Sequence, residues 1–237
     1  MTEASESGGT AGTTPAASPP GNQHDHNRDR LTSPERVTAL SDGVFAIVIT
    51  ILVLEIAVPE GLSGQSLRQV LEELRPTLVA WVVSFLITGM YWVAHRDLFS
   101  RIRVVNRDLV WLNLLFLLPV SLIPFAASVL GKYSEEPIAV HLYGVVMIAS
   151  TVMRLVLYWY VTRRPTLQWP DQSTDRARVG LAIAASPVVV YVIAMLVADI
   201  SAAVSIALYF SVPALYFLLV TLLRDRAGTR DEADEFS

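Results

Sequence analysis

Six long apolar blocks limit what this chain can fold into. Each block runs for about 20 residues, the length of an α-helix that crosses the roughly 30 Å hydrocarbon core of a bilayer. The chain is 53% hydrophobic and only 17% charged, whereas a soluble domain carries about a quarter charged residues. The blocks do not alternate apolar and polar residues, as membrane-spanning strands do. The sequence therefore predicts an all-α membrane protein with six transmembrane helices.

Start and stop signals place these helices along the chain. Residues 32–35, Thr-Ser-Pro-Glu, supply a hydroxyl cap, a proline in the first turn and an early carboxylate, and Pro59 follows the end of the first block. The predicted helices cover residues 32–58, 75–98, 109–130, 138–161, 177–197 and 202–223. Around them we expect a disordered cytoplasmic tail at 1–31, a six-helix transmembrane domain at 32–225 and an acidic cytoplasmic tail at 226–237.

Arginine residues gather on one side of the predicted helices. Fourteen of them lie in the N-terminal flank, the second and fourth connections and the C-terminal flank, whereas the opposite loops carry only Arg68, Arg75 and Lys132. Basic residues stay on the cytoplasmic side of a membrane protein. We therefore expect both termini in the cytoplasm and a multi-pass protein of the bacterial plasma membrane.

The chain carries no pattern of catalytic or metal-binding residues. It has no cysteine and four histidines, and none of the histidines has a metal-ligand spacing with a helical partner. No Gly-x-Ser-x-Gly elbow and no glycine-rich phosphate loop is present. His24 and His26 favour a solvated linker over a weak metal site. We expect a protein that is not an enzyme, uses no cofactor and binds no nucleic acid.

The first predicted helix, residues 32–58, has two different faces. At about 100° per residue, Ile47, Ile51 and Leu54 fall on one face with Thr50 beside them. Asp42 and the neighbouring serine fall more than about 100° away. The apolar stripe faces lipid or a helix neighbour in one interpretation, and lines a pore in the other.

Four polar residues from four helices share one layer near the predicted cytoplasmic end: Asp42, His95, Asn113 and Arg154. Charges at this depth are tolerated when they are paired and hydrogen-bonded. We interpret the layer as a structural clamp in which Asp42 accepts from Arg36 or Arg154 and from His95. The rival interpretation is a proton relay, because Asp and His carry protons in many transporters.

Residues 36–47, RVTALSDGVFAI, resemble the Arg-x-x-x-Phe-Ser-Asp signature of the transmembrane protein 175 family, which comprises the endolysosomal potassium channel and its prokaryotic relatives. The runs ITILVLEI at 49–56, YWVAH at 91–95 and NLLF at 113–116 are also similar to the family. The six-span layout matches one family repeat. Leu40 stands where the family has phenylalanine, which removes aromatic packing around the motif.

The resemblance implies a potassium-preferring cation leak channel whose pore is lined by the first helix of each of four subunits in a homotetramer. By position, Ile47 would form the narrowest constriction, with Ile51 and Leu54 as further rings toward the outside. Thr50 would supply the hydroxyl linked to potassium preference. The residues implied to hold the first helix in place are Arg36, Ser41, Asp42, Trp92, His95 and Asn113.

Two other functions stay open on the sequence. One is a proton-coupled secondary transporter that uses Asp42 and His95. The other is a membrane scaffold without transport. The partners expected for the channel are permeating potassium ions, the lipid bilayer and further copies of the same chain.

Overall fold

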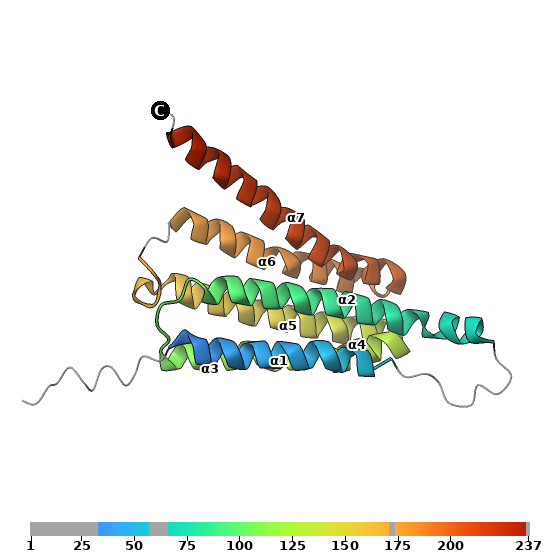
Figure 1. Ribbon diagram of the computed structural model, residues 1–237. Helices are drawn as coiled ribbons and strands as arrows, with labels where there is room; N and C mark the ends of the chain where they lie inside the picture. Colours follow the sequence, from blue (N-terminus) through green and yellow to red (C-terminus); the bar gives the residue numbers. More distant parts are fainter. Residues whose placement is uncertain (1–32, 57–65, 171–173, 236–237) are drawn as a thin grey trace, which may run out of the picture. The chain divides into compact units, whose positions relative to one another are not determined.

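The chain folds as a succession of α-helices (Figure 1). A computed structural model describes residues 33–56, 66–170 and 174–235. Over these residues the backbone forms no strand, and Ile102 and Gln168 make an isolated antiparallel bridge. The predicted tail at 1–31 lies outside the described residues. In chain order the elements are α1 (Pro34–Leu54), α2 (Leu67–Phe99), α3 (Arg107–Ser121), α4 (Ile123–Lys132), α5 (Pro137–Thr162), the 3₁₀ turn η2 (Pro165–Leu167), α6 (Thr174–Val197) and α7 (Ala202–Glu235).

The described chain holds six helical stretches that are long and apolar enough to cross a membrane. α3 and α4 together make the third stretch, and each of the other helices makes one. The predicted all-α, six-span fold is therefore confirmed. The start signal is confirmed as well, because Ser33 caps α1 and its side chain accepts a hydrogen bond from the Glu35 amide.

Several predicted boundaries were wrong. α1 ends at Leu54, with Glu55 as its C-cap, and not near residue 58. α2 begins eight residues earlier than predicted, at Leu67, since Ser66 and Gln69 form a capping box there. α7 continues to Glu235, through most of the segment predicted as an acidic tail.

The third span, predicted over residues 109–130, is broken at Leu122. Pro119 lies inside α3, and Pro124 stands in the first turn of α4. A proline has no amide hydrogen and its ring clashes with the carbonyl one turn earlier, so two prolines five residues apart interrupt the helical ladder. Pro187 and Pro213, in contrast, lie inside α6 and α7 without ending them.

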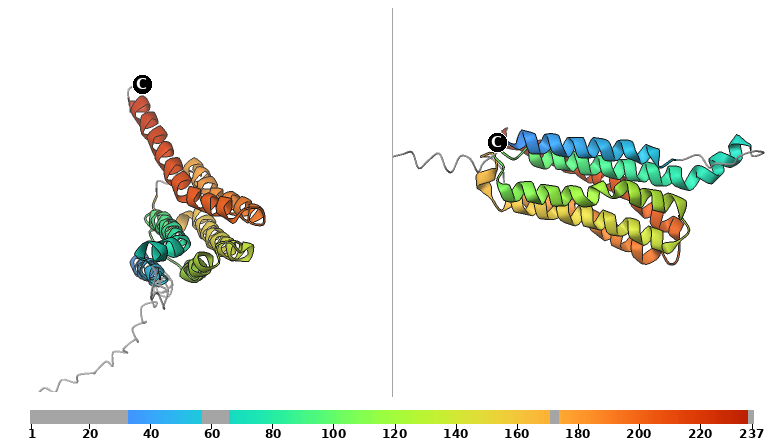
Figure 2. Two further views of the ribbon diagram at one scale, coloured as in Figure 1. Left: turned by 90° about the vertical axis from the view of Figure 1, so that its right-hand side faces the viewer. Right: turned by 90° about the horizontal axis from the view of Figure 1, so that it is seen from below.

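The core lies where α2 and α5 meet the third span. α1 packs on α2, α3 and α4, while α5 packs on α3, α4 and α6, and α7 packs mainly on α6 and α2. Figure 2 shows the pairing of α1 with α2 and of α3 and α4 with α5. Val83, Ile87 and Met147 are fully buried between these helices. α6 and α7 form the tight hairpin that their short connection predicts.

Candidate functional site

One face of α1 is buried against its own chain. The buried residues recur every three or four positions, which is the repeat of one helix face. They are Val37, Ser41, Phe45, Val48 and Leu52. This face packs on α2 and on the two halves of the third span, so the rest of the bundle fixes the rotation of α1 about its axis.

The opposite face of α1 carries what we call the exposed stripe: Ile47, Ile51 and Leu54. Their side chains are 58%, 38% and 75% exposed in the single chain. Apolar side chains exposed on a membrane helix contact lipid, another subunit or a pore. The wheel prediction that these three residues share a face is in keeping with their exposure, and Leu40 at the start of the same face is also exposed.

Thr50 lies beside the exposed stripe, and its hydroxyl hydrogen is donated to the backbone of its own helix. The hydroxyl is 3.0 Å from the Ala46 carbonyl oxygen and 2.9 Å from the Ile47 carbonyl oxygen, to which it donates. A threonine hydroxyl has one donor and two acceptor lone pairs. Because the donor is satisfied within α1, the exposed oxygen presents lone pairs outward, which is the polarity that a cation requires.

Behind the exposed stripe, three buried side chains form a hydrogen-bonded chain across three helices. The Asn113 amide donates to the Ser41 hydroxyl at 2.9 Å, and the Asn113 carbonyl oxygen lies 2.8 Å from His95 Nε2. All three residues are at most 1% exposed. Since Asn113 uses its nitrogen toward Ser41, its oxygen accepts, and the network assigns the Nε2 proton to His95.

Aromatic rings enclose the His95 imidazole. The ring stacks on Phe99 with centroids 4.3 Å apart and on Phe116 at 5.6 Å, and Phe45 of α1 lies 5.9 Å away. The Nδ1 atom is buried without a hydrogen-bond partner in the described part of the chain. A proton relay needs a polar partner on each side of the carrier, and His95 has a partner on one side alone.

Asp42 is fastened separately, on the exposed side of the same helix. Its carboxylate accepts a hydrogen bond of 2.8 Å from the indole nitrogen of Trp92, and the guanidinium of Arg96 sits 5.4 Å from that indole ring. Arg36 is exposed and takes part in no ion pair among the described residues. The structure thus brings together the predicted residues Asp42 and Trp92, and separately Ser41, His95 and Asn113.

The predicted pairing of Asp42 with Arg154 is wrong. Arg154 is 4% exposed and donates at 2.7 Å to the carbonyl oxygen of Ala184 on α6, with its Nε left without a partner in the described residues. Asp42 and Arg154 lie at a similar predicted depth in the membrane, but their side chains face different neighbouring helices. α5 meets α6 along its length, and the Arg154 side chain follows that contact.

Sequence reasoning missed a second buried polar cluster, located between α2, α5 and α6. The Tyr91 hydroxyl lies 2.7 Å from the Thr151 hydroxyl and donates to the Met147 carbonyl at 3.0 Å, with Tyr191 at 3.5 Å. The sequence holds no signal for it, because the partners of Tyr91 lie 56 to 100 positions away along the chain.

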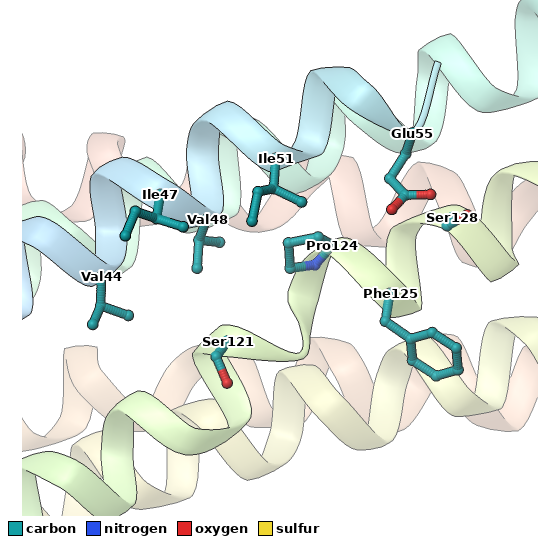
Figure 3. A pocket seen from close by; sticks show the side chains of 9 residues that line it. All are labelled: Val44, Ile47, Val48, Ile51, Glu55, Ser121, Pro124, Phe125 and Ser128. Atoms are coloured by element: carbon teal, nitrogen blue, oxygen red, sulfur yellow. The ribbon is translucent and has the colours of Figure 1, made fainter. Parts of the chain in front are cut away.

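A cavity of about 480 Å³ adjoins the exposed stripe (Figure 3). It lies between α1 and the broken third span, and Ile47 and Ile51 border it. Glu55, which was not singled out in the sequence, stands at one end near Ser128, whereas Ser121 lies toward the other end (Figure 3). The full lining is Val44, Ile47, Val48, Ile51, Glu55, Ser121, Pro124, Phe125 and Ser128.

The described residues offer no cluster of three or more His, Asp or Glu side chains that would hold a metal ion. Four polar groups near α1 are engaged in hydrogen bonds between helices, those of Ser41, Asp42, His95 and Asn113, and the exposed stripe beside them is apolar. Such a surface suits the passage or exclusion of an ion, since an apolar constriction gates by losing and regaining water.

The chain is similar to known membrane channels. Residues 36–124 match the family described as endosomal/lysosomal potassium channel TMEM175. A potassium channel of Streptomyces collinus is 38% identical over 65% of this chain and 80% of its own length. The human endosomal/lysosomal proton channel TMEM175 is 26% identical, and this chain spans 33% of its length.

Solved structures are similar as well. The crystal structure of a lysosomal potassium-selective channel TMEM175 homolog from Chamaesiphon minutus superposes with a TM-score of 0.65 at 29% identity, and covers 78% of this chain and 96% of that one. The crystal structure of a T38A variant of the potassium channel MtTMEM175 gives a TM-score of 0.53 at 15% identity. This similarity bears on the fold alone.

Proposed function

The chain belongs to the TMEM175 family, and on that premise we propose that it is a potassium-preferring cation leak channel. Relatives from Streptomyces, Chryseobacterium and Chamaesiphon that are 31–40% identical are named potassium channels. The family is one of ion channels and not of enzymes. The proposal extends the relatives' activity to this chain.

The observation that carries the proposal is the exposed stripe of α1. Its apolar side chains are exposed in the single chain, and Ile47 and Ile51 border the cavity beside the third span, while the buried chain of Ser41, Asn113 and His95 holds the helix from the other side. A helix whose rotation is fixed from one side can present the other side reproducibly to a symmetry axis. Four such helices in a homotetramer would enclose a narrow apolar path.

Ile47 forms the narrowest ring of this proposed pore, and Ile51 and Leu54 form wider rings toward the outside. Dry isoleucine rings gate conduction by dewetting and discriminate poorly between cations of like charge. The Thr50 oxygen supplies lone pairs next to the constriction. We therefore expect a leak-like conductance with a modest preference for potassium over sodium.

The proposed orientation follows the positive charges. The N-terminus of α1 and the α2–α3 and α5–α6 connections lie at the same end of the helices (Figure 1). Together with the helix turns that flank them, these segments carry most of the described arginines. Placing that end in the cytoplasm of a bacterial cell satisfies the positive-inside rule. Residues 32–225 then form the channel domain, with cytoplasmic segments at 1–31 and 226–237.

Substituting the proposed gate tests the function. Ile47→Asn places an amide in the narrowest ring, which lowers the cost of wetting it. In phosphatidylcholine vesicles loaded with potassium and containing the purified protein, we expect a clearly faster potassium efflux than for the unsubstituted chain. Efflux is followed with a potassium-sensitive dye under an imposed gradient.

Val53→Asn is the matched control. Val53 lies on the same helix, is 48% exposed and points about 120° away from Ile47 on the helical wheel. Its substitution should leave the flux unchanged. An equal rise for both variants would mean that an amide on α1 merely perturbs the bilayer, and no rise for Ile47→Asn would remove Ile47 from the pore.

A further inference from the structure

Two connections at one end of the helices are tied into a single unit. The amide of Arg103 donates to the Leu167 carbonyl at 2.8 Å, and the amide of Trp169 donates to the Arg101 carbonyl at 3.1 Å. These bonds flank the antiparallel bridge between Ile102 and Gln168. We call this unit, residues 100–107 and 163–170, the loop platform.

The interior of the loop platform is packed as firmly as the bundle itself. Ile102, Val105 and Leu167 are 2%, 0% and 4% exposed and belong to the hydrophobic core. Side chains that project from such a unit keep their relative positions, because the backbone beneath them is held by both hydrogen bonds and buried apolar contacts. The loop platform is therefore a preorganised surface.

Its outer surface is basic. The described residues place five arginines on it, and among these Arg164 alone has a carboxylate partner, Asp108, at 3.9 Å. The five are Arg101, Arg103, Arg107, Arg163 and Arg164, of which Arg101 is half-buried and the others are exposed. The opposite end of the helices has nothing comparable, since its basic residues are Arg68, Arg75 and Lys132.

Exposed tryptophans surround this basic surface. Trp159 and Trp169 are 48% and 53% exposed, and Trp111 in α3 is 57% exposed. The Arg163 guanidinium carbon lies 5.3 Å from the centre of the Trp159 ring, a cation–π contact that steadies the arginine. Tryptophan side chains concentrate at the depth of lipid headgroups, so the arginines beside them meet phosphates there.

We propose that the loop platform binds the headgroup of an anionic phospholipid. A guanidinium donates two parallel hydrogen bonds to one phosphate, a geometry that lysine cannot reproduce. In the orientation proposed above, this lipid lies in the cytoplasmic leaflet. The binding itself does not depend on that orientation and is argued from the loop platform alone. The occupant is a lipid and not a soluble anion, because the tryptophans supply apolar surface for the glycerol and acyl region.

The loop platform also connects to the fastening of α1. It starts directly after Phe99, whose ring stacks on His95, and it leads into α3, which carries Asn113. A lipid bound to the loop platform therefore restrains the C-terminal end of α2 and the N-terminal end of α3. These are the two helices whose side chains, His95 and Asn113, form the buried hydrogen-bonded chain with α1. Binding of an anionic phospholipid is expected to raise the melting temperature of the protein.

The experiment uses the full-length, delipidated protein in a non-ionic detergent, titrated with dioleoylphosphatidylglycerol or dioleoylphosphatidylcholine. Native mass spectrometry counts the retained lipids, and tryptophan fluorescence reports the melting temperature. The unsubstituted protein should prefer phosphatidylglycerol. Arg103→Gln combined with Arg163→Gln should weaken that binding about tenfold or more, since each basic residue near an anionic surface contributes on the order of a fivefold factor.

The control is Arg68→Gln combined with Lys132→Gln at the opposite end, which should leave the preference intact. The pair Arg103→Lys and Arg163→Lys keeps the charge and the fold, and should bind with intermediate affinity. Equal binding of both lipids, an equal loss in the control pair, or displacement by soluble glycerol phosphate overturns the proposal. Potassium flux in phosphatidylcholine vesicles is measured in parallel, so a failure of the channel proposal is read independently of lipid binding.

Discussion

Asp42 is held by a neutral donor. Its partner is the indole nitrogen of Trp92, and the guanidinium of Arg96 sits over that indole ring. A hydrogen bond that accepts from an uncharged N–H does not depend on a counter-charge. The arrangement suits a structural fastening and offers no route from Asp42 to His95, which bonds to Asn113 instead.

The substitution Asp42→Asn separates the fastening from a proton relay. An asparagine oxygen still accepts from Trp92, so we expect the melting temperature and the potassium flux to stay close to those of the unsubstituted protein. A proton-coupled transporter would lose its flux, because the amide does not titrate. Flux in vesicles with and without a pH gradient makes the measurement.

Asp42→Leu completes that comparison. It keeps the approximate size of the side chain and removes the acceptor, which is expected to cost about 1.5–3 kcal/mol for a hydrogen bond to a charged group. A stability loss in Asp42→Asn as large as in Asp42→Leu would show that the charge itself is required, contrary to the fastening by Trp92.

At the scale of the helices, α5 packs closely against both α6 and α7 at Gly144. A Cβ atom at this position would lie 2.6 Å from Met195 Cγ on α6 and 2.6 Å from the Tyr209 hydroxyl on α7. Tyr209 also donates to the Val140 carbonyl at 3.0 Å. Small residues at helix contacts let backbones approach in membrane proteins, and here one glycine serves three helices.

Gly144→Ala is therefore expected to destabilise the protein by about 1–3 kcal/mol, the cost of overpacking a filled interior. Thermal unfolding in detergent, followed by tryptophan fluorescence, gives the measurement. Gly89→Ala is the matched control, because nothing lies within 4 Å of a Cβ there and alanine is favoured over glycine in a helix by about 0.5–1 kcal/mol. Equal shifts in both variants would contradict the close approach at Gly144.

On the scale of the whole molecule, a single chain leaves the exposed stripe of α1 and the adjoining cavity uncovered. The channel proposal fills this surface with the axis of a tetramer. Because the chain has no cysteine, a single substitution gives each subunit one thiol. Any disulfide or thiol modification can then be assigned to the substituted position.

We expect Ile51→Cys to place four thiols around one axis. Mild oxidation should then yield disulfide-linked dimers on a denaturing gel, and a thiol-reactive ammonium reagent should block potassium flux. The native mass should be four times that of the 26.1 kDa chain. Val53→Cys serves as the control that forms neither product, and a monomeric mass would end the four-subunit proposal.

Local sequence was sufficient for much of the fold. Block length and hydropathy predicted six spans, and Ser33 and Pro34 marked the start of α1, because a helix in lipid must satisfy its own backbone within a fixed thickness. The 3.6-residue period also separated the faces of α1, with Ile47 exposed and Phe45 buried. These features depend on neighbours along the chain.

Contacts between helices were decided by the tertiary structure alone. Arg154 and Asp42 have similar depth in the sequence, yet Arg154 reaches Ala184 and Asp42 reaches Trp92. The break at Leu122 was visible as two prolines, but not the cavity beside it. Depth follows from counting residues along one helix, whereas a partner depends on how helices rotate and pack against each other, which the sequence of a single span does not encode.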